Sequence, residues 1–175
     1  MILLLSLPLI LASSYPRLCL SAAVNRTIDD KNGDSVTGAV PSYIPESPQW
    51  IQGDQCSFCN INSAIVDVDQ VHDGTWHDAT YLTKNSSSEL VIAFNFEGSA
   101  IYIYNVIVNQ VSSSSGPVTT ATNLSFHLDG VNVGQFTRAP DDSKNVLYNV
   151  PVYVNTSLEN KHQEKKRLLG CAREL

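Results

Sequence analysis

The residues best suited to chemistry lie in one loop-rich stretch, which runs from Trp50 to Tyr81. Within this stretch Trp76, His77 and Asp78 are consecutive. Exposed aromatic rings stack on sugar rings, and Asp and His side chains exchange hydrogen bonds with hydroxyl groups. The stretch therefore suggests a carbohydrate-binding set that consists of Trp50, Trp76, His77, Asp78 and Tyr81. The alternative, which the usual burial of tryptophan favours, is that Trp76 closes one end of a hydrophobic core.

The densest group of carboxylates in the sequence occurs in the same stretch, at Asp67, Asp69, Asp73 and Asp78. Calcium takes oxygen ligands from carboxylates and loop carbonyls, so Asp67, Asp69 and Asp73 form a candidate calcium site. No EF-hand pattern is present, and that class of calcium site is excluded. An acidic, solvated loop without an ion is the favoured alternative, and no other cofactor is expected.

Two cysteines and two histidines have the spacing of a zinc finger, at Cys56, Cys59, His72 and His77. Both histidines of a zinc finger lie on one helix, whereas residues 73–76 between these two are turn-forming. We therefore expect no zinc. In an oxidising compartment Cys56 and Cys59 form a disulfide instead, which would pin a single turn because the loop it closes is short.

No nucleophile with its activating partners can be recognised. The Gly-x-Ser-x-Gly and Ser-x-x-Lys patterns and the glycine-rich phosphate loops are absent from the sequence. A pair of carboxylates for glycoside hydrolysis leaves no sequence signature, so a small secreted hydrolase is retained as the least favoured alternative. We predict that the protein is not an enzyme.

Alternation of apolar and polar residues dominates the second half of the chain and predicts β-strands. These strands would form the scaffold that positions the candidate residues of the stretch from Trp50 to Tyr81. Leu90–Phe96 and Ala100–Val108 indicate a hairpin whose second strand is central and buried. Asp129-Gly130 is a strong turn signal between two further alternating runs. Pro151 predicts that Val146–Val154 is an edge strand or carries a bulge. Many short strands and almost no helical periodicity predict an all-β antiparallel β-sandwich or jelly roll.

The first 23 residues, Met1–Ala23, read as a signal peptide, because an apolar run of about a dozen residues is followed by small residues. The chain is therefore expected to be secreted. Four N-x-[ST] sequons support an extracellular location and predict glycosylation. The acceptor residues are Asn25, Asn85, Asn123 and Asn155. A glycan on Asn123 would place His127 on the wet face of its strand and Phe126 in the core.

Charge separates the folded part of the chain from its last residues. The domain predicted over residues 24–160 has five basic against fifteen acidic residues. Such a charge repels phosphate backbones, so a nucleic acid is excluded as a partner. Residues 161–175 contain five further basic residues, show no alternation and include the odd Cys171. This charged, atypical tail predicts a truncated or misread C-terminus, and a short basic helix is the alternative.

An ordered set of short motifs resembles one group of proteins over about residues 24–160. The motifs are Val24–Asp30, Gly33–Gly38, Cys56–Cys59, His72–Asp78 and Phe96–Tyr102. The set resembles uncharacterised cell-surface proteins of basidiomycete fungi, which have a signal peptide and a single membrane-spanning helix. The resemblance implies a jelly roll similar to galactose-binding domains and brings no catalytic activity. It also implies that a membrane anchor would follow the domain, which this chain replaces with its charged tail.

Together these features predict a non-catalytic extracellular β-sandwich that binds carbohydrate or another cell-wall component. A structural or protein-interaction ectodomain, with another surface protein as its partner, is the alternative. The protein would lie at the cell surface as a membrane protein if the C-terminus is truncated.

Overall fold

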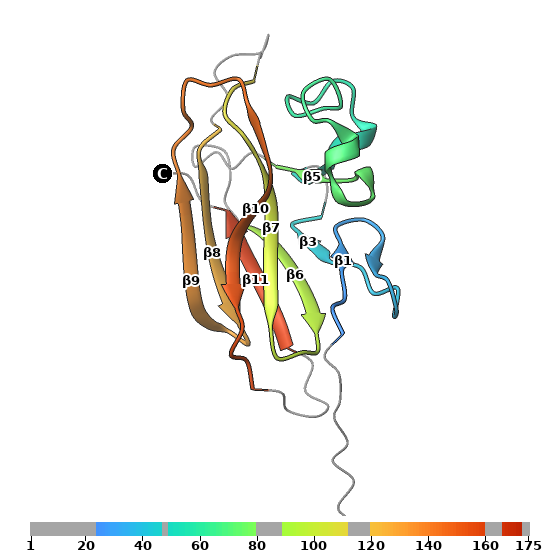
Figure 1. Ribbon diagram of the computed structural model, residues 1–175, viewed down its shortest axis with the longest axis vertical. Coiled ribbons are helices and arrows are strands. Elements are labelled where there is room, and N and C mark those ends of the chain that lie inside the picture. Colours follow the sequence, from blue (N-terminus) through green and yellow to red (C-terminus); the bar gives the residue numbers. More distant parts are fainter. Residues whose placement is uncertain (1–23, 47–48, 80–88, 112–119, 160–165, 173–175) are drawn as a thin grey trace, which may run out of the picture.

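A computed structural model describes residues 24–46, 49–79, 89–111, 120–159 and 166–172. The predicted signal peptide, Tyr81 and Asn85 lie outside these residues. The described chain consists mostly of antiparallel β-strands, with three short 3-10 turns as its only helical elements (Figure 1), and this confirms the all-β prediction. None of its helical segments approaches the length and apolar character that crossing a bilayer requires.

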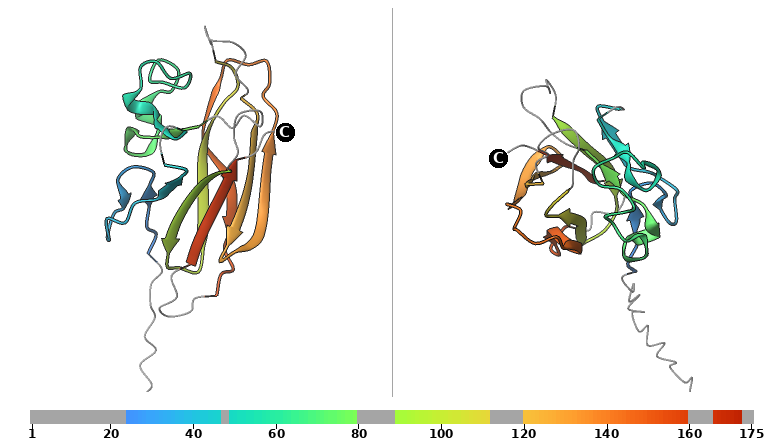
Figure 2. Two further views of the ribbon diagram at one scale, coloured as in Figure 1. Left: turned by 180° about the vertical axis from the view of Figure 1, so that it is seen from behind. Right: turned by 90° about the horizontal axis from the view of Figure 1, so that it is seen from above.

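Two sheets face each other and form the body of the molecule (Figures 1 and 2). The larger sheet has five strands in the order β3-β6-β11-β8-β9, and every neighbouring pair is antiparallel. Its strands are β3 (Ser42–Ile44), β6 (Leu90–Phe96), β8 (Thr122–Leu128), β9 (Val131–Arg138) and β11 (Lys166–Ala172). The smaller sheet pairs β7 (Ile101–Val108) with β10 (Val146–Asn155).

The N-terminal half adds a layer of short ribbons beside β6 and β7 (Figure 1). One ribbon pairs β1 (Ile28–Asp29) with β2 (Gly33–Asp34), and another pairs β4 (Ile51–Gln52) with β5 (His77–Asp78). Between β4 and β5 the chain makes three 3-10 turns, which are η1 (Gly53–Gln55), η2 (Val68–Gln70) and η3 (His72–Gly74).

Apolar side chains fill two clusters. The first lies between the two sheets and is centred on Ile101, Phe126 and Val152. Leu124 and Leu128 of β8 pack on the same cluster, which confirms the predicted core face of that strand. The second cluster, of Val66, Trp76 and Val108, anchors the loops between β4 and β5 on the sandwich.

Two local predictions are confirmed. Asp129 and Gly130 join β8 to β9 with φ values of 51° and 84°, the positive values that a tight two-residue hairpin turn requires. Strand β10 shifts register on both sides of Val150–Pro151, as a strand interrupted by a residue without a backbone N–H is expected to do.

The predicted hairpin of residues 90–108 is wrong. Strand β6 pairs with β3 and β11, whereas β7 pairs with β10 in the opposite sheet. The link from Glu97 to Ala100 therefore crosses between the layers. Strand β7 is also not buried on both faces, since Tyr102 and Tyr104 are 51% and 57% exposed. Alternation shows that two segments are strands but does not specify which strands pair.

The charged tail, for which a short basic helix was the alternative prediction, contributes a strand and no helix within residues 166–172. Lys166–Ala172 forms β11 between β6 and β8, with Gly170 opposite both Ile92 and Phe126. A strand with a neighbour on each side bonds through its backbone, so its pairing does not depend on side-chain alternation. The sheet therefore includes chain that lies beyond the predicted domain boundary at residue 160.

Candidate functional site

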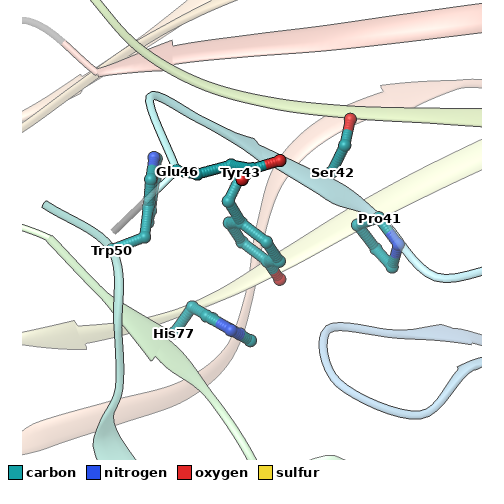
Figure 3. Close-up of a pocket in the computed structure, with 6 residues that line it drawn as sticks. All are labelled: Pro41, Ser42, Tyr43, Glu46, Trp50 and His77. Carbon is teal, nitrogen blue, oxygen red and sulfur yellow. The ribbon is translucent and has the colours of Figure 1, made fainter. Parts of the chain in front are cut away.

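A groove opens where β3, the segment before β4, and β5 meet. It has a volume of about 400 Å³ and is shown in Figure 3. Its lining residues are Pro41, Ser42, Tyr43, Glu46, Trp50 and His77. Pairing of Tyr43 with Ile92 fixes β3 to the large sheet, and pairing of Gln52 with His77 brings Trp50 close to the histidine.

Three rings form the centre of the groove. The rings of Tyr43 and His77 are stacked, with centroids 3.9 Å apart and an interplanar angle of 20°. The Trp50 ring lies 5.3 Å from that of Tyr43 at a tilt of 58°, and its Nε1 donates to the Ile44 carbonyl at 3.1 Å. The rings are therefore held in place by contacts within the protein.

The Tyr43 hydroxyl is bound to the turn between β1 and β2. Its Oη donates to the carbonyl of Asp30 at 2.7 Å. Burial of Tyr43, followed by the negative charges of Asp30 and Asp29, raises the pKa of the phenol above its usual range. The hydroxyl therefore stays protonated and serves as a donor.

A polar network behind the rings connects the same turn to β5. His77 Nδ1 lies 2.5 Å from Asp30 Oδ2, and Thr75 Oγ1 donates to Asp30 Oδ1 at 2.6 Å. Thr75 Oγ1 also lies 3.1 Å from Asp29 Oδ1. A carboxylate only accepts hydrogen bonds, so Nδ1 of His77 carries a proton and donates it to Asp30.

The buried Asp29 carboxylate organises the β1–β2 turn. Its Oδ1 accepts from the backbone N–H groups of Lys31 and Asn32 at 3.0 and 2.7 Å. Lys31 of the same turn pairs with Asp54 at 3.2 Å. The local turn and the long-range contact to Thr75 thus hold the acidic residues of the turn at the rear of the groove.

Asp78, the second residue of β5, differs from the other carboxylates of this region. Burial raises its pKa to about 6, against a smaller opposing effect of a hydrogen bond from the Ala79 backbone. Its pairing with Ile51 fixes it in the β4–β5 ribbon. Asp78 therefore titrates in the mildly acidic range, although it is not among the residues that line the groove.

One group of side chains in the described part of the chain could hold a metal ion. Asp29, His72 and Asp73 each offer a ligand atom, and these atoms lie within 4.8 Å of one another. The Asn32 amide donates to Asp73 Oδ2 at 3.2 Å. An imidazole with two carboxylates suits zinc or manganese better than the all-oxygen set expected for calcium.

The predicted calcium ligands are not gathered into one group. Asp67 caps η2, because its Oδ1 accepts from the backbone N–H of Asp69 at 3.1 Å. Its Oδ2 accepts from the Gln70 side chain at 2.9 Å. Asp73, in contrast, lies with Asp29. Of the predicted set, only Asp73 belongs to the group that could bind a metal.

The predicted carbohydrate-binding residues divide between the groove and the core. Trp50 and His77 line the groove, whereas Trp76 is only 7% exposed and packs in the second apolar cluster. Its Nε1 donates to the Ile61 carbonyl at 3.3 Å. The position of Trp76 is therefore that of the alternative interpretation, a residue that completes the core.

Sequence reasoning missed Tyr43 and Glu46. Both fall in a proline-rich segment that shows too little alternation to be recognised as a strand. Tyr43 is fixed in the groove only because β3 pairs with β6 almost fifty residues later, at Ile92. No local signal in the sequence could have identified it.

The predicted disulfide is present, with Cys56 and Cys59 joined at 2.02 Å. It holds a turn whose tip residue, Phe58, is 86% exposed. The sequon residue Asn25 is exposed as well, whereas Asn123 and Asn155 are half-buried on β8 and β10. Glycosylation at these residues stays a prediction.

Comparison with known proteins identifies no relative. The chain matches no family model, no curated protein and no solved structure.

Proposed function

We propose that the protein is a non-catalytic extracellular module that binds carbohydrate, or a carbohydrate-bearing cell-wall component, in the groove of Figure 3. One observation carries the proposal: two aromatic rings, an imidazole and a carboxylate converge on one concave surface. Aromatic rings accept the C–H faces of sugars, and the polar groups orient their hydroxyls. As part of the proposal, a five-stranded sheet on a smaller sheet supports a jelly roll similar to galactose-binding domains.

Binding without turnover is favoured because the polar groups around Asp30 are engaged with one another. The Asp30 carboxylate accepts from both Thr75 and His77, and the Asp30 carbonyl accepts from Tyr43. These contacts hold the Tyr43 and His77 rings in one arrangement, as expected of groups that position a binding surface.

The test is a glycan array followed by calorimetric titration of the saccharides that bind. Trp50→Ala is expected to weaken binding about tenfold or more, because a stacking surface is lost. Phe58→Ala is the matched control, since Phe58 is an exposed aromatic residue away from the groove lining. Absence of binding to every saccharide, or equal losses in the two variants, would contradict the proposal.

A protein-interaction ectodomain is the second candidate, and the outer face of the small sheet favours it. Tyr102, Tyr104 and Val154 are all about half exposed there, and Val154 pairs with Tyr102. Chemical crosslinking and light scattering would reveal self-association through this face. A Tyr104→Ser variant that abolished crosslinks while Trp50→Ala left them unchanged would support this function in place of sugar binding.

A further inference from the structure

We propose that the saccharide bound in the groove is an amino sugar whose amine is free and protonated. The inference rests on the proposed function and names the chemical class of the ligand. It follows from the charge of the groove and from the rings that line it.

The groove is negatively charged. Among the residues that the structure describes, its lining includes the exposed carboxylate of Glu46 and no lysine or arginine. A second carboxylate, that of Asp30, contacts His77 of the groove lining. Lys31, which lies in the β1–β2 turn next to Asp30, is paired with Asp54. A cation entering the groove therefore meets the carboxylate of Glu46, and an anion such as a uronic acid is repelled.

The aromatic rings also favour a positively charged ligand. An ammonium group close to the face of a tryptophan or tyrosine ring is attracted by the electrons of that ring. Trp50 and Tyr43 lie in the same groove as Glu46 (Figure 3), so a single ligand can contact all three. A carboxylate beside aromatic faces is an arrangement that recognises a primary ammonium.

A pyranose ring with a free amine matches both the aromatic rings and the Glu46 carboxylate of the groove. Its apolar C–H face can pack on an aromatic ring while its ammonium pairs with Glu46. Acetylation of the amine removes the charge and leaves the ring face unchanged. The acetylated sugar is therefore the matched ligand that isolates the contribution of the ammonium.

The experiment compares three probes by calorimetric titration with the full-length protein: a glucosamine tetramer, the corresponding N-acetylglucosamine tetramer and a tetralysine peptide. Each is measured at low and at high salt. We expect the glucosamine tetramer to bind at least about fivefold more tightly than the acetylated one. Added salt should reduce this preference, because the ion pair is exposed to solvent.

Two variants assign the preference to the groove. Glu46→Gln should remove most of it, whereas Glu97→Gln, which removes an equal charge from the exposed link between β6 and β7, should not. Both residues are exposed, so both variants are expected to fold.

The outcomes separate the two proposals. Equal binding of the two tetramers, with loss in Trp50→Ala, would overturn the amino-sugar inference and leave sugar binding standing. Equal binding of tetralysine and the glucosamine tetramer would show that the sugar ring contributes nothing, and would overturn the inference. No binding of any saccharide, on the array or here, would overturn both.

Discussion

At the scale of single residues, one hydroxyl group holds the site together. Thr75 is buried, and its Oγ1 lies within hydrogen-bonding distance of the carboxylates of both Asp29 and Asp30. The single hydrogen of this hydroxyl is shared between two negative groups that would otherwise repel each other. Thr75 is a positioning residue, because it holds Asp30 in contact with His77 and Tyr43.

Replacement of Thr75 by valine, which keeps the shape and removes the hydroxyl, is expected to destabilise the protein by about 1–3 kcal/mol. Two buried or half-buried carboxylates would lose their shared donor. Urea unfolding measures the loss, and Thr75→Ser should retain most of the stability. Equal stability of Thr75→Val and the wild type would show that the hydroxyl does not hold the carboxylates.

Asp78 gives stability an unusual dependence on pH. Its pKa of about 6 in the folded protein exceeds the usual value of 3.8, so between these values the folded state binds more protons than the unfolded state. Its contribution is therefore most favourable below about pH 4, declines as the pH rises towards 6, and stays unfavourable above that.

Asp78→Asn should thus raise the free energy of unfolding by roughly 2 kcal/mol at pH 7 and by little at pH 4. Urea unfolding of variant and wild type across this range gives the difference directly. Asp142→Asn, at an exposed position, serves as the control. A gain that did not depend on pH would contradict the assignment to burial of the charge.

At the scale of elements, β11 decides whether the large sheet is continuous. It supplies backbone partners to β6 on one side and to β8 on the other. Without it both strands would have an open edge, and open edges pair with other molecules.

A chain that ends at residue 160 is therefore expected to aggregate, which size-exclusion chromatography would detect. A chain that ends at Ala172, which keeps all of β11, should elute as the full-length protein does. A monomeric, cooperatively folded product from the shorter chain would show that β11 is not required for the sheet.

At the scale of the whole molecule, surface accessibility should decide which predicted glycosylation sites are used. Asn25 is exposed in the segment before β1. Asn155 is half-buried, and its side-chain amide donates to the Tyr153 hydroxyl at 3.3 Å. Expression through a eukaryotic secretory pathway should therefore give higher occupancy at Asn25 than at Asn155. Peptide mass spectrometry before and after enzymatic deglycosylation measures both, and a higher occupancy at Asn155 would contradict the expectation.

The features that the sequence determined by itself are those with local causes. Alternating side chains showed that residues 90–96 are a strand, because neighbouring residues of a strand face opposite sides. A run of β-branched and aromatic residues showed the same for residues 101–108. Asp129-Gly130 determined a turn because few residue pairs tolerate two positive φ angles. Cys56 and Cys59 are close enough in the chain to meet without help from the rest of the fold.

The features that only the tertiary structure decided depend on contacts between distant parts of the chain. Strand pairing separated β6 from β7 and placed β11 between β6 and β8. The groove arose in the same way, because Asp30, Tyr43 and His77 come from three segments that share no local pattern. Trp76, the most suggestive residue of the linear sequence, entered the core, since burial of a large ring stabilises the fold wherever space is available. The candidate site therefore depends on packing, which a one-dimensional pattern does not specify.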